Sequence, residues 1–149
     1  IDAKIIDKKL NKLKWITSYY PYDPKKETFK LKKAIEIIKS DNRKKIIVTD
    51  YQFISVILNI YDYSPNKFWH SGVGSPNKGD KYFNVYRNFF IKKLKENKIE
   101  VIYSVEPIFL SDVEGEILKP ILDEKCFNKI TLTDIVDSFL ILKCDELIN

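Results

Sequence analysis

The chain has 149 residues, which suits one domain. Its hydrophobic content of 44% and aromatic content of 13% argue against a disordered protein. The net charge of +5 invites a nucleic-acid partner, but only Arg43 and Arg87 among 26 basic residues are arginines, and the lysines alternate with acids along the chain. A solvated lysine surface is therefore the preferred interpretation, and a basic nucleic-acid-binding module remains an alternative.

The sequence contains no methionine, even at position 1. A natural full-length chain begins with methionine, so we expect a processed chain or part of a larger protein. No secretory signal and no apolar run long enough to span a bilayer is visible. Any targeting or membrane segment of the parent is expected outside this stretch.

Cys126 and Cys144 are the only cysteines. With a single histidine and no Cys-x-x-Cys pair, the sequence argues against a zinc site, and no cofactor is predicted. Whether the two cysteines pair is left open. A disulfide between them would close a short loop, stabilise the fold by roughly 3 kcal/mol and indicate an oxidising compartment.

The N-terminal part predicts an irregular lead-in over residues 1–12, a strand over 13–17 and an aromatic turn over 18–23. Asp23-Pro24 then marks a helix start, because aspartate is a favoured N-cap and proline at the first helical position loses no hydrogen bond. The helix is expected to reach about residue 39. Its buried face follows a helical period of apolar residues: Leu31, Ala34, Ile35 and Ile38.

Residues 44–60, KKIIVTDYQFISVILNI, form the segment around which the rest is organised. A buried strand is predicted over 46–49 and a helix over about 52–60. This helix is apolar on most sides, so we expect it to be covered nearly all round. Because open α/β sheets bind ligands beyond the carboxyl ends of their strands, Asp50 is the best-placed polar residue of the segment.

The remaining elements alternate in type. A short edge strand is predicted over 67–70, followed by a glycine-rich surface loop to residue 80, where Asp80 caps a helix to about 97. Further elements are a strand over 99–105, a weaker helix over about 114–122 and a final strand over 135–142, with 130–132 as a possible neighbour. The order of these elements predicts that residues 1–149 form one α/β domain. The expected architecture is three-layer and Rossmann-like, with a mostly parallel sheet of about five strands and helices on both faces.

One apparent motif does not hold. Gly72-x-Gly74 followed by Lys78-Gly79 resembles a phosphate loop, but neither the P-loop spacing nor the dinucleotide-loop spacing is present. A flexible surface loop is the preferred interpretation.

Two carboxylates end the central strands. Asp50 and Glu106 could bind a cation or act as an acid–base pair if they lie side by side. The simpler interpretation, which we favour for Asp50, is that it caps the helix that follows.

Three residues with ring side chains are expected near the crevice at the carboxyl ends of these strands. His70, the only histidine, could serve as a general base if it faced Asp50, although a structural role is the more common one for such a residue. Tyr51 and Trp69 could stack on a sugar or a base, and packing explains them equally well. These residues are ligand-binding candidates, and none is assigned a catalytic role.

Several sequence segments resemble those of a known protein family. A helix ending in AIEIIK, then KKIIVTDYQFISVIL and, downstream, KYFNVYRNFFIKKLKENKIEVIYSV are similar to the C-terminal soluble domain of bacterial membrane glycosyltransferases of the dolichyl-phosphate-mannose-protein mannosyltransferase type, which use polyprenyl-phosphate sugars. The resemblance covers roughly residues 33–105.

The resemblance implies an α/β domain on the extracytoplasmic, periplasmic face, tethered by transmembrane helices of its own parent chain. It fits both the missing methionine and a Cys126–Cys144 disulfide. The catalytic carboxylates of that family lie in its membrane part, so no catalytic residue is carried over. The chain is therefore expected to be an accessory domain that contacts an acceptor, a glycan or a lipid-linked sugar and is inactive alone. The alternative is a self-contained binding domain or enzyme that uses the Asp50, His70 and Glu106 crevice for a nucleotide or sugar.

Overall fold

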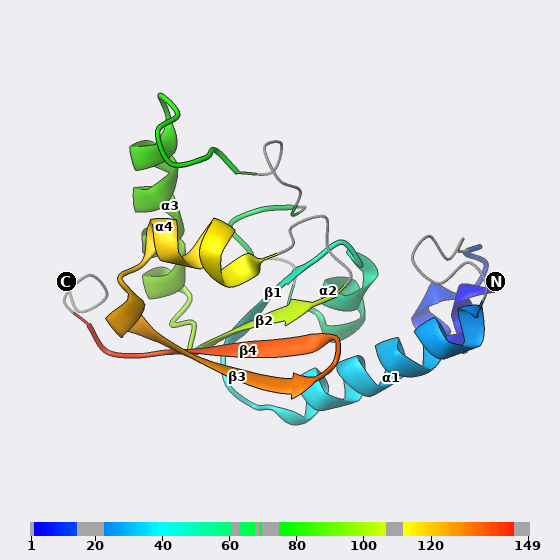
Figure 1. Cartoon of the computed structure of the whole chain (residues 1–149). Helices are drawn as coiled ribbons and strands as arrows, with labels where there is room; N and C mark the ends of the chain where they lie inside the picture. The colour runs from blue at the N-terminus through cyan, green and yellow to red at the C-terminus, as the bar shows by residue number, and fades with distance from the viewer. Residues whose placement is uncertain are drawn as a thin grey trace.

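The computed structural model describes residues 2–14, 23–60, 63–67, 69, 75–106 and 112–144. The first half contains two 3₁₀ turns, η1 (Ala3–Ile5) and η2 (Lys8–Leu10), then α1 (Pro24–Ser40), β1 (Lys45–Thr49) and α2 (Phe53–Leu58). The second half contains α3 (Phe83–Glu96), β2 (Val101–Val105), the π-helical segment η4 (Glu114–Leu118), α4 (Lys119–Ile121), the 3₁₀ turn η5 (Glu124–Cys126), β3 (Phe127–Thr133) and β4 (Val136–Ile141) (Figure 1).

The four strands of the described residues form one mixed sheet in the order β1-β2-β4-β3. β1 and β2 run parallel, with Thr49 opposite Val105 at their carboxyl ends. β4 pairs antiparallel with both β2 and β3. The sheet therefore has β1 and β3 as its edges, and only one of its three strand pairs is parallel.

This sheet overturns the predicted fold class. A five-stranded, mostly parallel, Rossmann-like sheet was expected from the alternation of strands and helices, and that prediction is wrong. The physical reason is the hairpin: β3 and β4 are joined by the short turn at Asp134 and Ile135, which forces them to be antiparallel. The last strand then enters beside β2 in the opposite direction.

Helices cover both faces of the sheet, and each face has its own hydrophobic core. On one face, α1 and α2 pack on Ile47 of β1 and Tyr103 of β2. On the other face, α3 and the η4–α4 helix pack on Ile46, Ile102 and Phe139. The alternation of neighbouring strand residues between the two cores follows from the twofold period of a strand.

The first helix forms as the sequence predicts. Asp23 is its N-cap, and Oδ1 of Asp23 accepts a 3.0 Å hydrogen bond from the backbone N–H of Lys26, with Pro24 as the first helical residue. The predicted apolar face is buried in the core that α1 shares with the sheet: Leu31, Ala34, Ile35 and Ile38.

The next two helices both expose apolar side chains. Val56 of α2 is 51% exposed, so the expectation that this helix is enclosed nearly all round is wrong. Gln52 occupies the N-cap position of this helix and makes no side-chain capping hydrogen bond, so the helix begins two residues later than the capping role expected for Asp50 requires. Val85 and Phe89 of α3 are also exposed, and so is Tyr82 at the N-cap of that helix.

Several predicted features lie partly or wholly outside the described residues. Of the strand over 13–17, Lys14 forms an isolated antiparallel bridge with Asp2, Leu13 is in no strand, and residues 15–17 are outside. His70, Gly72 and Gly74 are outside as well. The edge strand over 67–70 is described only at residues 67 and 69, neither of which is in a strand.

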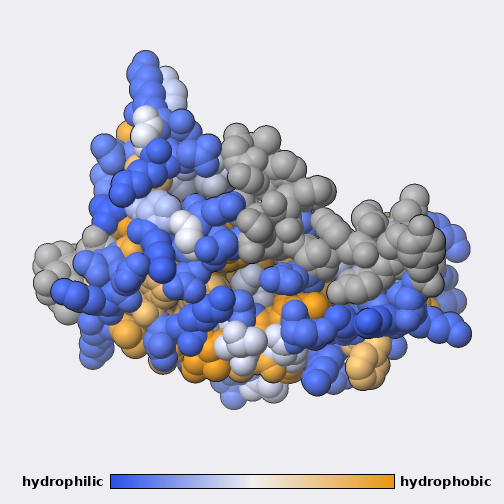
Figure 2. Space-filling view, in the orientation of Figure 1, coloured by the Kyte–Doolittle hydropathy of each residue, from blue (hydrophilic) through white to orange (hydrophobic). Residues whose placement is uncertain are grey.

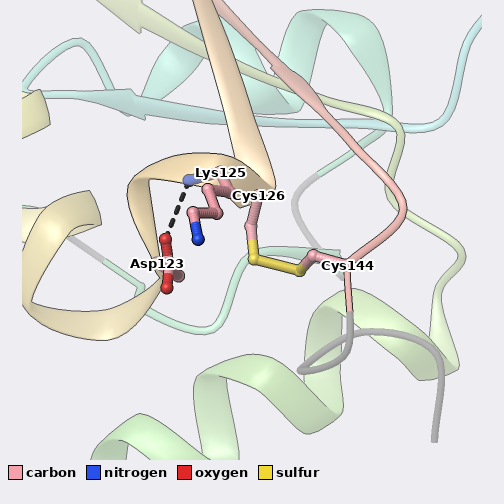
Figure 3. Close-up of a disulfide and its surroundings, with 4 residues drawn as sticks. All are labelled: Asp123, Lys125, Cys126 and Cys144. Atoms are coloured by element: carbon pink, nitrogen blue, oxygen red, sulfur yellow. Dashed lines mark hydrogen bonds between the residues drawn. A yellow bond between two sulfur atoms is a disulfide. The ribbon is translucent and has the colours of Figure 1, made fainter.

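The two cysteines form a disulfide (Figure 3). Cys126 ends η5 just before β3, and Cys144 follows β4, so the bond ties the open end of the hairpin. Asp123 supports this corner, because its Oδ1 accepts a 3.0 Å hydrogen bond from the backbone N–H of Lys125. Cys126 is fully buried in the core beneath α3 and α4.

Candidate functional site

A cavity of about 310 Å³ lies beside the carboxyl half of β1, at the edge of the sheet. We call it the Asn66 cavity. Its volume is near the lower end of the range typical of small-ligand sites, about 300–1,000 Å³. Three segments line it: Ile47 and Thr49 of β1; Gln52, Ser55 and Val56 at and within α2; and Ser64, Asn66, Lys67 and Trp69.

The end of β1 is shaped by Thr49. Its hydroxyl donates a 2.9 Å hydrogen bond to the carbonyl of Val105 on β2 and accepts one from the backbone N–H of Tyr51 at 3.1 Å. The side-chain amide of Gln52 donates to the Thr49 carbonyl at 3.2 Å. These bonds turn the chain from strand to helix within three residues and place the first turn of α2 at the mouth of the cavity.

Asn66 is the most unusual polar group of the cavity wall. The residue is 8% exposed, and its Oδ1 accepts a 3.0 Å hydrogen bond from the hydroxyl of Tyr86 on α3. Its Nδ2 is buried and has no hydrogen-bond partner. Leaving such a donor unpaired costs about 1–3 kcal/mol, so an acceptor atom of a ligand would find a favourable position there.

Neighbouring bonds hold Asn66 in place. Ser64 donates from its hydroxyl to the carbonyl of Asn66 at 2.6 Å. Burial raises the pKa of Tyr86 to about 12, which keeps its phenol protonated and able to donate to Asn66. The amide therefore has a fixed position before any ligand arrives.

Trp69 supplies an aromatic part of the cavity wall. It is 3% exposed and packs edge-to-face on Phe90 of α3, with ring centroids 6.1 Å apart. The cavity therefore joins an aromatic surface to several amide and hydroxyl groups. Lys67 is the one charged residue among the described lining residues.

The two predicted carboxylates end adjacent strands but do not line this cavity. Asp50 follows Thr49, and Glu106 follows Val105, so they lie at the same end of the parallel pair. Asp50 is half-buried; Glu106 is exposed, and its backbone N–H donates to the carbonyl of Ile135 at 2.8 Å. His70 lies outside the described residues, so its position relative to Asp50 and Glu106 is not described.

Tyr51 points into the protein and away from the cavity. Its hydroxyl donates a 2.8 Å hydrogen bond to Oε1 of Glu27 on α1, and both residues are buried. Oε2 of Glu27 has no hydrogen-bond partner. Desolvation raises the pKa of Glu27, and the hydrogen bond from Tyr51 opposes that rise. Tyr51 is therefore a member of the core beneath α1 and α2.

Sequence reasoning located Trp69 but missed the other polar lining residues. Ser64, Asn66 and Lys67 lie in a stretch without helical or strand period, where burial cannot be inferred from the pattern. Ser64-Pro65-Asn66 carries only a turn signal. That signal places a turn, and it gives no reason to expect a buried amide.

Comparisons with protein-family models, with curated proteins and with solved structures found no match for this chain. Within the described residues, no cluster of three or more His, Cys, Asp or Glu side chains is arranged to hold a metal ion. No helix in the same part of the chain is long and apolar enough to cross a bilayer. The function is therefore argued from the Asn66 cavity and from the chemistry of its wall.

Proposed function

We propose that this chain is an accessory, extracytoplasmic binding domain that holds a sugar in the Asn66 cavity and serves a larger membrane glycosyltransferase-type protein. The observation that carries the proposal is Asn66, a residue that lines the cavity and whose buried Nδ2 has no hydrogen-bond partner. An unpaired buried donor lowers the stability of the protein when the site is empty, and it can donate a hydrogen bond to a ligand when the site is occupied.

The wall of the cavity favours a sugar over a nucleotide. A pyranose ring has an apolar face that packs on an aromatic side chain such as Trp69, and its hydroxyls pair with amide and hydroxyl groups. Gln52, Ser55 and Asn66 provide such groups. A nucleotide would bring several phosphate charges, and Lys67 is the only cation among the described lining residues.

An accessory role outside the cytoplasm is supported by two further observations. The Cys126–Cys144 disulfide is the kind of bond that persists in oxidising compartments. Sequence segments within residues 33–105 resemble the soluble domain of a membrane glycosyltransferase family. The catalytic carboxylates of that family lie in its membrane part. Asp50 and Glu106 do not line the Asn66 cavity, so the proposal assigns neither of them to catalysis.

The side-chain amide of Asn66 gives a direct readout of the proposal. In ¹H–¹⁵N NMR spectra of the chain, its NH₂ pair should shift on titration with methyl glycosides of mannose, glucose and galactose, or with a short-chain polyprenyl-phosphate sugar. At least one of these probes should move the Asn66 signals together with the indole N–H of Trp69. If all the probes leave both signals unmoved, the Asn66 cavity is not a sugar site.

Two variants test the cavity by different means. Asn66→Asp keeps the acceptor for Tyr86 and removes the donor, whereas Val56→Trp fills the cavity from a position that is 51% exposed. Both should abolish the shift of the Trp69 indole N–H, which is the signal that remains in Asn66→Asp. Val85→Trp, on the exposed side of α3, is the matched control and should leave binding unchanged. Binding that survives in both cavity variants would overturn the proposal.

A further inference from the structure

The positive charge of the chain is concentrated at one end. Residues 1–33 contain ten lysines and four acids, a net charge of +6, whereas the whole chain carries +5, so residues 34–149 together carry −1. Nine of the ten lysines are exposed. The 3₁₀ turns and the first half of α1 therefore form a basic end on an otherwise nearly neutral molecule. Figure 2 shows this end, where α1 begins, as mostly hydrophilic on the visible face.

Apolar groups are exposed within this basic end. Phe29 is 69% exposed and Ile5 is 40% exposed, and both line an open hollow of about 440 Å³. Lys25 and Lys32 line the same hollow. Lys25, Phe29 and Lys32 are spaced by four and three residues along α1, so they share one face of the helix. The ring of Phe29 therefore lies between two lysines on the helix, and Ile5 is a second apolar residue of the same hollow.

We propose that this basic end docks on the surface of an anionic lipid bilayer. An interfacial helix binds a membrane by burying aromatic and aliphatic side chains at the headgroup level while lysines contact the anionic lipids. Phe29 and Ile5 provide the apolar contact, and the surrounding lysines provide the charge. Lysine side chains suit this position because their apolar stems lie along the acyl boundary and their ammonium groups reach the headgroups.

A nucleic acid is the competing partner for a basic surface, and the residues favour lipid. Arginine is the side chain best suited to bidentate phosphate and base contacts, and residues 1–33 contain none. The open hollow floored by Ile5 and Phe29 offers apolar burial, which a phosphate backbone does not use. The surface is also separate from the Asn66 cavity, with no lining residue in common. Its test can therefore fail while sugar binding stands, and the reverse also holds.

Vesicle co-sedimentation of the chain tests the proposal. The chain should pellet with vesicles made of equal parts of phosphatidylglycerol and phosphatidylcholine and stay in the supernatant with phosphatidylcholine alone. Raising the ionic strength from about 0.01 M to about 1 M, which shortens the Debye length from about 30 Å to about 3 Å, should release most of the bound chain. Equal binding to neutral vesicles, or none to the anionic vesicles, would overturn the proposal.

Matched variants locate the contact. Lys25→Glu/Lys32→Glu should lower the partition coefficient at least about tenfold, because each lysine near an anionic surface contributes strongly. The control Lys78→Glu/Lys81→Glu makes the same change in net charge on exposed residues before α3 and should have a much smaller effect. Phe29→Ser should lower partitioning several-fold, whereas Val85→Ser, which changes an equally exposed residue at 69%, should not.

Two results would refute this assignment of the surface. One is an equal loss of vesicle binding in the control variants (Lys78→Glu/Lys81→Glu and Val85→Ser) and in the α1 variants, which would reflect net charge or nonspecific hydrophobic adsorption. The other is binding of single- or double-stranded DNA that depends on Lys25 and Lys32 while vesicle binding is absent, which would identify a nucleic-acid surface. Phe29 and the two lysines are exposed, so the variants are expected to fold, and circular dichroism checks that they do.

Discussion

The hydroxyl of Tyr51, at the exit of β1, donates a 2.8 Å hydrogen bond to Oε1 of Glu27, in the first turn of α1. Glu27 is 1% exposed and Tyr51 is 4% exposed. This hydrogen bond holds a carboxyl group in the core, and the other oxygen of that carboxyl, Oε2, has no hydrogen-bond partner. This arrangement links the first helix to the end of the central strand.

Glu27 makes stability depend on pH in a specific direction. Desolvation raises its pKa above the ordinary 4.5, so the folded state holds the proton more tightly than the unfolded state. The resulting stabilisation is complete below pH 4.5 and is lost as the pH rises through the folded pKa. Glu27→Gln keeps an acceptor for Tyr51 and does not titrate, so its free energy of unfolding should exceed that of the wild type at pH ~8 and approach it at pH ~4.

Urea unfolding at a series of pH values measures this difference. Glu36→Gln, on the exposed side of the same helix, is the control and should give a curve parallel to that of the wild type. A Glu27→Gln curve that also runs parallel to the wild type would show that Glu27 titrates normally.

The Asp41 carboxylate predicts the opposite pH dependence. It accepts hydrogen bonds from Arg43 at 2.7 Å and from the Tyr103 hydroxyl at 2.6 Å, and the bonds from Arg43 lower its pKa the most. The stabilisation is present above the ordinary pKa of 3.8 and is lost as the pH falls through the folded pKa. Asp41→Asn should cost about 1–3 kcal/mol at neutral pH, and less at acid pH.

Thermal or urea unfolding of the variant at neutral and acid pH provides the measurement. Glu96→Gln removes exposed ion pairs to Lys92 and Lys93, and it should change stability by less than about 1 kcal/mol. An Asp41→Asn effect as small as that of Glu96→Gln, or one that grows in acid, would contradict the expectation.

The disulfide should be worth about 3 kcal/mol, because it closes a loop with a sequence separation of 18 residues. We expect Cys126→Ala/Cys144→Ala to lower the free energy of unfolding by about that amount in denaturant titrations. A reducing agent should destabilise the wild type to the same extent and leave the double variant unchanged. Reductant sensitivity of the double variant would assign the effect to something other than this bond.

Local sequence signals predicted the individual elements better than their assembly. Asp23-Pro24 and the apolar period that follows it located α1, because capping and amphipathicity act within a few residues. The direction of β4 depended on the turn at Asp134 and Ile135. That turn lacks the Asn-Gly or Asp-Gly pair that signals a tight hairpin, so a crossover to a parallel strand was the default expectation.

The candidate site was predictable only in part. Among the residues predicted to bind a ligand, Trp69 lines the Asn66 cavity, whereas Asp50, Tyr51 and Glu106 do not. Asn66 could not be predicted, because the hydrogen-bond partner of its side chain is Tyr86, 20 residues along the chain. Tyr51 is the second residue after β1 and faces α1, since the turn at Thr49 directs its ring into the core.

The strand order also sets an order of folding. β3 and β4 are joined by a two-residue turn, whereas β1 reaches its neighbour β2 only after about 50 intervening residues, and loop closure costs more as the loop lengthens. We expect the hairpin to form early and β1 to dock late. In stopped-flow experiments, Phe139→Leu should mainly slow folding and Val48→Ala should mainly speed unfolding, and the reverse pattern would contradict this order. Because β1 supplies a wall of the Asn66 cavity, a sugar bound there should leave the folding rate unchanged and slow unfolding, so occupancy would extend the lifetime of the native state.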